Sequence, residues 1–192
     1  MSTKTDDLLQ AILDAQGPVG YARLAEYHES AMTTAAVAGV VVRPTTAALI
    51  RIYNGERVGG KSLVMDRLFC FQLVSAAAAS YYTMWYCLGH PPINVAEPTN
   101  EIVTLRGTGD GRSADNGTVH VEVDATVVDE GWFPCGGAGP VEATGVLPGG
   151  GTEWECHGRL LVPPRHCLSM HVSASSVNED FTVGASWWRM QV

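Results

Sequence analysis

Apolar and polar residues alternate along four segments in the second half of the chain. In the first of these segments, Val119, Val121 and Val123 alternate with His120 and Glu122. Successive side chains of a β-strand point to opposite faces, so alternation with a period of two predicts a strand that is buried on one face. The four segments are residues 119–127, 154–162, 168–174 and 181–187.

Further segments predict strands nearer the N-terminus. They are residues 48–53, 63–74, 80–88 and 102–105. Turn-forming Gly, Pro, Asn and Asp residues separate the segments, and no amphipathic helix lies between them. About eight short strands in succession predict two packed sheets. The predicted fold class is mainly β: a jelly-roll-like two-sheet β-sandwich that forms the body of the protein, residues 37–192.

In the segment 63–74, a period of two also predicts which side chains share a face. On a helix the apolar residues of this segment would point in every direction, so a strand fits better. One face of that strand is apolar apart from Arg67, and the other is mixed. The more apolar face consists of Leu63, Met65, Phe69, Phe71 and Leu73.

Residues 1–36 are predicted to form a short helical N-terminal arm. Asp6 can cap a first helix, Gly17-Pro18 ends it, and a second helix is expected over residues 21–30. Two short helices cannot form a core alone, so the arm must dock on this body, on a second copy or on another protein. Its predicted partner-binding residues are the apolar positions Leu8, Leu9, Ile12, Leu13, Tyr21, Leu24 and Tyr27.

Composition and charge narrow the function. A chain of 192 residues with 46% hydrophobic and 17% charged residues suits one domain with a large core. The formal net charge is −8, which disfavours binding to nucleic-acid phosphates. The 5 Cys include no C-x-x-C pair and are odd in number, which predicts buried, reduced thiols in a chain made in a cytoplasm.

A membrane span is not expected. Residues 68–88 carry no formal charge, but they contain Gln and Ser residues and lack flanking basic anchors. Two buried strands joined through an Ala-rich stretch explain this region better.

Residues 55–62, GERVGGKS, match the phosphate-loop pattern G-x-x-x-x-G-K-[ST]. A phosphate loop must follow a buried strand and open a helix whose N-terminus faces the anion. The residues after Lys61 and Ser62 alternate as a strand instead. We therefore interpret the motif as a glycine-rich hairpin turn, and keep nucleotide binding through Lys61 and Ser62 as an alternative.

Other catalytic or metal-binding chemistry has weak support. His120, His157 and His171 lie on the polar faces of predicted strands, where solvated histidines are commoner than ligands. Glu153 and Glu155 share a strand face, but no third group supports a catalytic pair. No catalytic residue, metal or cofactor is therefore predicted.

The pair Trp132-Phe133 lies beside Pro134 and Gly136 in a predicted loop. Aromatic residues on a loop of a β scaffold can bind a sugar or a protein partner. The favoured interpretation is that both side chains plug one end of the sandwich, with a contact surface as the alternative.

Several stretches resemble small virion proteins of tailed bacteriophages. They are IYNGE at residues 52–56, GKSLVMDR at 60–67, LVSAAA at 73–78, GRLLVPP at 158–164 and the closing segment 181–188. The resemblance extends over about residues 45–190. It implies a jelly-roll protein on the phage particle, such as a head decoration (cement) protein, without catalytic residues.

This resemblance implies a homotrimer that stabilises the head as part of the virion, after assembly in the host cytoplasm. The expected partners are further copies of the chain and the major capsid protein or other virion proteins, reached through the arm. The first alternative is a tail-associated or receptor- and glycan-binding jelly roll with Trp132 and Phe133 as its contact. The second is the phosphate-loop nucleotide-binding enzyme.

Overall fold

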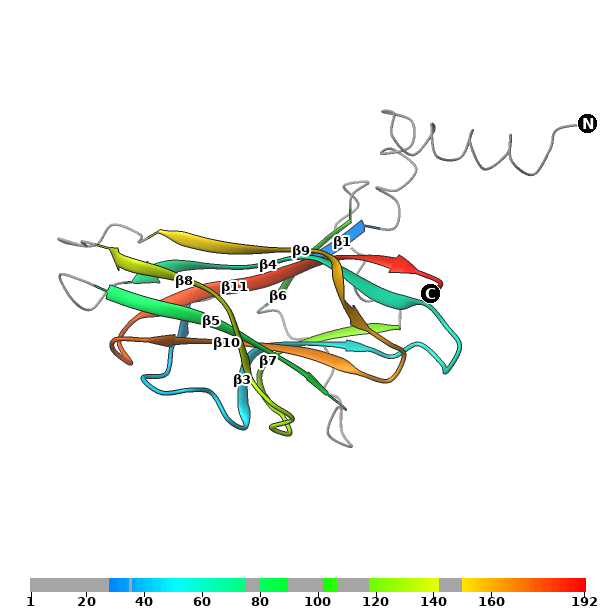
Figure 1. Ribbon diagram of the computed structural model, residues 1–192, viewed down its shortest axis with the longest axis horizontal. Coiled ribbons are helices and arrows are strands. Elements are labelled where there is room, and N and C mark those ends of the chain that lie inside the picture. Colours follow the sequence, from blue (N-terminus) through cyan, green and yellow to red (C-terminus); the bar gives the residue numbers. More distant parts are fainter. Residues whose placement is uncertain (1–27, 35, 75–79, 90–101, 107–117, 142–149) are drawn as a thin grey trace, which may run out of the picture.

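The computed structural model describes residues 28–34, 36–74, 80–89, 102–106, 118–141 and 150–192. This part of the chain contains eleven β-strands and no helix. The strands form two sheets that pack face to face (Figure 1). The prediction of a mainly β, two-sheet sandwich is confirmed. The predicted first helix and the apolar positions of the arm lie outside the described residues.

Sheet A has five strands in the order β6-β1-β11-β4-β9, and the short strand β2 pairs with β11 beside them. All of the strand pairs are antiparallel. The bounds are β1 His28–Thr33, β2 Val37–Ala38, β4 Ser62–Val74, β6 Ile102–Arg106, β9 Gly151–Val162 and β11 Asp180–Met190.

Sheet B has five antiparallel strands in the order β7-β3-β10-β5-β8. The bounds are β3 Ala47–Asn54, β5 Ser80–Gly89, β7 Val119–Thr126, β8 Phe133–Val141 and β10 Cys167–Ala174.

The strand pairs are nested along the chain. β1 pairs with β11, β3 with β10, β4 with β9 and β5 with β8. β6 and β7 come between β5 and β8 in sequence and pair with β1 and β3 at the edges of the two sheets. The early and late parts of the chain therefore lie side by side throughout the sandwich.

The main hydrophobic core fills the space between the sheets. Phe181 and Trp187 from β11 are fully buried there with Ile50 from β3 and Leu168 and Met170 from β10. Burial of apolar surface is the largest favourable term in folding, and long alternating strands supply it from both sheets.

The expected helix over residues 21–30 is wrong for its last three residues, because β1 begins at His28. The alternation of β1 is inverted: Glu29, Ala31 and Thr33 face the core. Glu29 can be buried because Trp187 Nε1 and Arg189 Nε donate to its Oε2 at 3.0 and 2.9 Å. β1, which lies within the predicted arm, therefore pairs with β11 and β6 of sheet A.

Strand β8 was not predicted, because its sequence FPCGGAGPV lacks alternation. Glycine and proline weaken strands, and proline is tolerated mainly at sheet edges. β8 is such an edge strand, since it pairs only with β5. Every one of the predicted strands has a counterpart in the structure.

The predicted apolar face of residues 63–74 is wrong beyond Met65. β4 shifts register between Met65 and Arg67 against β9, and β11 has a matching irregularity between Ser186 and Trp187. A bulge of one residue moves every later side chain to the opposite face. The residues of β4 that face the core are therefore Leu63, Met65, Leu68, Cys70 and Gln72.

Candidate functional site

The phosphate-loop motif lies in the connection between β3 and β4. β4 begins at Ser62, so a strand stands where a phosphate loop requires a helix N-terminus. The buried Asn54 holds the loop: its Nδ2 donates to the carbonyl oxygens of Lys61 and Val162 at 3.0 Å, and its Oδ1 accepts from the Glu56 N–H at 3.2 Å. The connection also crosses from sheet B to sheet A, so the predicted hairpin is wrong in detail.

The two aromatic residues predicted as a loop contact have different environments. Trp132 is only 4% exposed, and its Nε1 donates to the Thr45 carbonyl oxygen. Phe133 is 58% exposed and stacks on Tyr86 of β5 with ring centroids 5.9 Å apart. Trp132 covers the outer face of sheet B instead of plugging an end, so only Phe133 is available to a partner.

The three histidines considered as ligands do not converge. His171 was expected on a polar face, but it is only 3% exposed and meets the Trp132 ring edge to face at 6.2 Å. Burial lowers its pKa. His120 stacks on Tyr53, whereas His157 is exposed. Within the described ranges no group of three or more His, Cys, Asp and Glu residues is placed to hold a metal.

The five cysteines are free, and four of them are buried, as predicted. Burial raises the pKa of the Cys70, Cys135 and Cys156 thiols to about 12 and that of Cys167 to about 11. The thiolate is the reactive form of cysteine. These thiols are therefore structural core groups.

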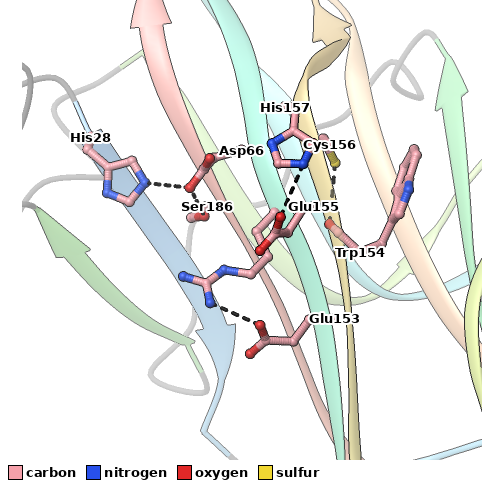
Figure 2. Close-up of polar contacts among 9 residues, drawn as sticks. His28, Asp66, Glu153, Trp154, Glu155, Cys156, His157 and Ser186 are labelled. Atoms are coloured by element: carbon pink, nitrogen blue, oxygen red, sulfur yellow. Dashed lines mark hydrogen bonds and ion pairs between the residues drawn. The ribbon is translucent and has the colours of Figure 1, made fainter. Parts of the chain in front are cut away.

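Figure 2 shows polar side chains on the outer face of sheet A. His28 Nε2 lies 3.3 Å from Asp66 Oδ2, and the Ser186 hydroxyl donates to the same oxygen at 3.3 Å. In a serine hydrolase the imidazole stands between the hydroxyl and the carboxylate and takes the hydroxyl proton. Here the carboxylate stands in the middle, so the arrangement does not activate Ser186 as a nucleophile.

A bulge in β9 adds further charges to this face. Glu155 pairs with Arg67 and Leu160 with Met65, so residues 156–159 are looped out of the ladder. His157 and Gly158 both have positive φ, at 48° and 71°. Within the bulge His157 Nε2 lies 3.1 Å from Glu155 Oε2, and beside it Arg67 and Glu153 form an ion pair at 3.0 Å. Both are solvent-exposed, so each contributes little to stability.

Apolar side chains continue the outer face of sheet A beyond these charges. Phe71 and Leu73 of β4 are 39% and 37% exposed, and Phe69 lies 5.9 Å from Phe71 between ring centroids. Phe71 covers Gly151 of β9, and Phe69 covers Gly184 of β11, where a Cβ atom would meet the rings. The neighbouring glycines let both rings lie low on the sheet. We call Phe69, Phe71 and Leu73 the β4 apolar row.

Sequence reasoning placed the β4 apolar row with core residues, because the alternation does not reveal the bulge. The one available signal was Arg67, which interrupts the apolar face at the point where the phase changes.

The outer face of sheet B is different, because the chain itself covers it. A second cluster of buried apolar residues lies there, and the partly buried Trp85 packs against it. The segments around residues 43 and 129 are tied together by the Arg43–Asp129 ion pair at 3.1 Å. The cluster consists of Ala48, Cys87, Ala125, Val127 and Trp132.

Comparison of the sequence with protein-family models found no match, and comparison with curated proteins found none. The part of the chain that the structure describes contains no helix long and apolar enough to cross a membrane.

Proposed function

We propose that this protein is a structural component of a tailed-phage virion: a trimeric decoration (cement) protein that binds the major capsid protein and stabilises the head. The observation that carries the proposal is the nested strand pairing of β1 with β11, β3 with β10, β4 with β9 and β5 with β8. This nested order supports the interpretation of the sandwich as a jelly roll, in which β6 and β7 would be an insertion at the sheet edges. Jelly rolls are common in viral capsid and lectin domains.

The described side chains support a binding role better than a catalytic one. The polar groups on sheet A are ordered His28–Asp66–Ser186, the thiols of Cys70 and Cys156 are buried, and β4 replaces the helix that a phosphate loop needs. The β4 apolar row is instead a contact surface, because exposed adjoining apolar side chains mark sites of protein association.

A cement protein acts by mass action. Each copy that binds the assembled lattice, but not the ruptured one, stabilises the lattice. In this proposal the body self-associates, and the arm contacts the shell or neighbouring copies through the apolar positions predicted from the sequence.

The deciding experiment is the copy number per purified virion, measured by quantitative mass spectrometry against the major capsid protein. Hundreds of copies would support a position on the head lattice. A dozen or fewer would favour the tail-associated or glycan-binding alternative, for which Phe71, Tyr81 and Phe133 are exposed aromatic side chains. Absence from the particle would contradict both.

A second experiment tests the arm. Deletion of residues 2–27 leaves β1 intact, whereas a longer deletion would remove the buried Glu29. The truncated protein should remain folded and trimeric but lose binding to heads. Unchanged head binding would contradict the role of the arm.

A further inference from the structure

The outer faces of the two sheets differ in what covers them. On sheet B, Trp132 and its neighbours form a buried apolar cluster. The two buried apolar clusters of the described residues include no side chain of the β4 apolar row. An apolar row on a strand within a sheet, not at its edge, needs a partner to remove it from water.

We propose that the β4 apolar row is the docking surface for the predicted first helix of this chain's own arm, residues 6–13. That segment presents apolar residues one helical turn apart, since Leu8 and Leu9 are followed by Ile12 and Leu13. It therefore offers an apolar stripe that has no partner within its own short helix.

The lengths of the two surfaces match. Eight residues of helix are about 12 Å long. From Phe69 to Leu73 the strand advances four residues, which is about 13 Å. The rings of Phe69 and Phe71 lie low over Gly184 and Gly151, so the row is shallow enough to accept a helix laid along it.

The arm also joins the body on this sheet. It ends at His28, which lies on the outer face of β1 against Trp188, with ring centroids 4.4 Å apart. On β11, His28 pairs with Trp188 and Phe69 pairs with Gly184, which precedes Trp188 by four residues. That offset is about 14 Å along the strand and about 10 Å across two strand spacings.

The connection is long enough for intramolecular docking. Residues 14–27 separate the predicted helix from β1 and can extend over about 46 Å. This is well beyond the span that has to be bridged. A tethered segment of this length has a high effective concentration at a nearby surface, which favours the arm of the same chain over that of another copy. The inference concerns the free protein and does not depend on the virion role.

The test is hydrogen–deuterium exchange, measured by mass spectrometry on the full chain. Docking predicts that the amides of residues 6–13 exchange at least about tenfold more slowly than in a free peptide of the same sequence. Phe71→Asp should abolish this protection, because it places a charge in the middle of the row. Val128→Asp is the matched control, since Val128 is an exposed apolar residue beside sheet B.

The amides of β10 report whether each variant is folded, because this strand lies at the centre of sheet B. If Phe71→Asp raises exchange there, Leu9→Asp replaces it, because Leu9 lies outside the described strands and core of the body. Leu9→Asp should abolish arm protection and speed exchange in β4. Arm amides that exchange at the peptide rate in the unmodified chain, or protection that survives Leu9→Asp, would overturn the proposal. If the protection disappeared on tenfold dilution of the protein, the arm would dock on another copy instead of on its own chain, and the proposal would be overturned.

Discussion

The two outer faces of the sandwich show two ways in which a β-sheet deals with its second side. Sheet B is covered by its own chain, and Trp132 and His171 meet there edge to face. Sheet A presents exposed polar contacts (Figure 2) and the β4 apolar row. Among the described residues, sheet B therefore has a buried apolar cluster on its outer side, whereas the apolar side chains of the β4 row stay partly exposed.

The largest expected effect tests the cover over sheet B. Trp132→Ala removes a buried indole and leaves the Thr45 carbonyl oxygen without its donor. The free energy of unfolding should fall by about 3–5 kcal/mol. Urea denaturation followed by circular dichroism measures the change. Phe133→Ala is the matched control because Phe133 is exposed, and a loss equal to that of Trp132→Ala would contradict the assignment of Trp132 as the cover.

A smaller effect tests the close packing beneath the β4 apolar row. A Cβ atom at Gly184 would lie 2.5 Å from the Ala31 carbonyl oxygen and 2.5 Å from Phe69 Cζ. Gly184→Ala should therefore destabilise the protein by about 1–3 kcal/mol, as overpacked sites do. Gly150→Ala is the control, since nothing lies within 4 Å of its added methyl group. If the two variants had equal midpoints of thermal unfolding, the packing around Gly184 would be looser than the structure indicates.

His171, which is buried against Trp132 on sheet B, predicts that the stability of the protein depends on pH. Burial lowers the pKa of His171 in the folded protein. The unfolded chain therefore binds a proton at the ordinary histidine pKa of about 6.5, where folded His171 does not. The stability contributed by neutral His171 is complete above that pH and is lost as the pH falls through the lowered pKa.

The measurement is the free energy of unfolding between neutral and mildly acidic pH. His171→Gln should flatten the decline toward acid. The control is His157→Asn, because His157 is exposed and asparagine tolerates the positive φ of that position. A decline of the same slope in His171→Gln as in the unmodified protein would assign the pH dependence to other groups.

The smallest expected effect concerns the exposed charges on sheet A. Arg67 and Glu153 form a pair in which both side chains are largely exposed. Glu153→Ala should cost about 0.2–1 kcal/mol, and the loss should shrink as salt is added. Glu29→Ala is the contrast, because it leaves the buried Arg189 without its carboxylate and should cost about 3–5 kcal/mol. If Glu153→Ala and Glu29→Ala reduced the free energy of unfolding by similar amounts at low salt, the Arg67–Glu153 pair would have to be shielded from water.

The pattern of apolar residues and turns predicted strands β3 to β7 and β9 to β11, but not β1, β2 or β8. β1 turns Glu29 inward, and that becomes favourable only when Trp187 and Arg189, far away in the sequence, supply donors. β8 carries too many glycine and proline residues to show a period. β1 is held in place by pairing with β11, and β8 by pairing with β5. The local pattern of residues does not reveal these long-range pairings.

The candidate surface was less predictable than the fold. Phe69, Phe71 and Leu73 have the same hydrophobicity as core residues, and only the shift in β4 turns them outward. His171 was predicted to be solvated because Ser169 and Ser173, on the same face of its strand, are polar, but Trp132 lies over it. After the motif at residues 55–62 the predicted strand is present, because the alternation of the following residues already indicated it, but the connection joins two sheets and is not a hairpin.

The sequence by itself determined that this is a mainly β chain with a sandwich body, because a period of two is a local property that each strand carries within its own residues. Tertiary structure alone decided which face of β4 is buried and which of the described aromatic residues are exposed. These properties depend on register and on contacts between segments that lie far apart in the chain, and a single bulged residue is enough to reverse them.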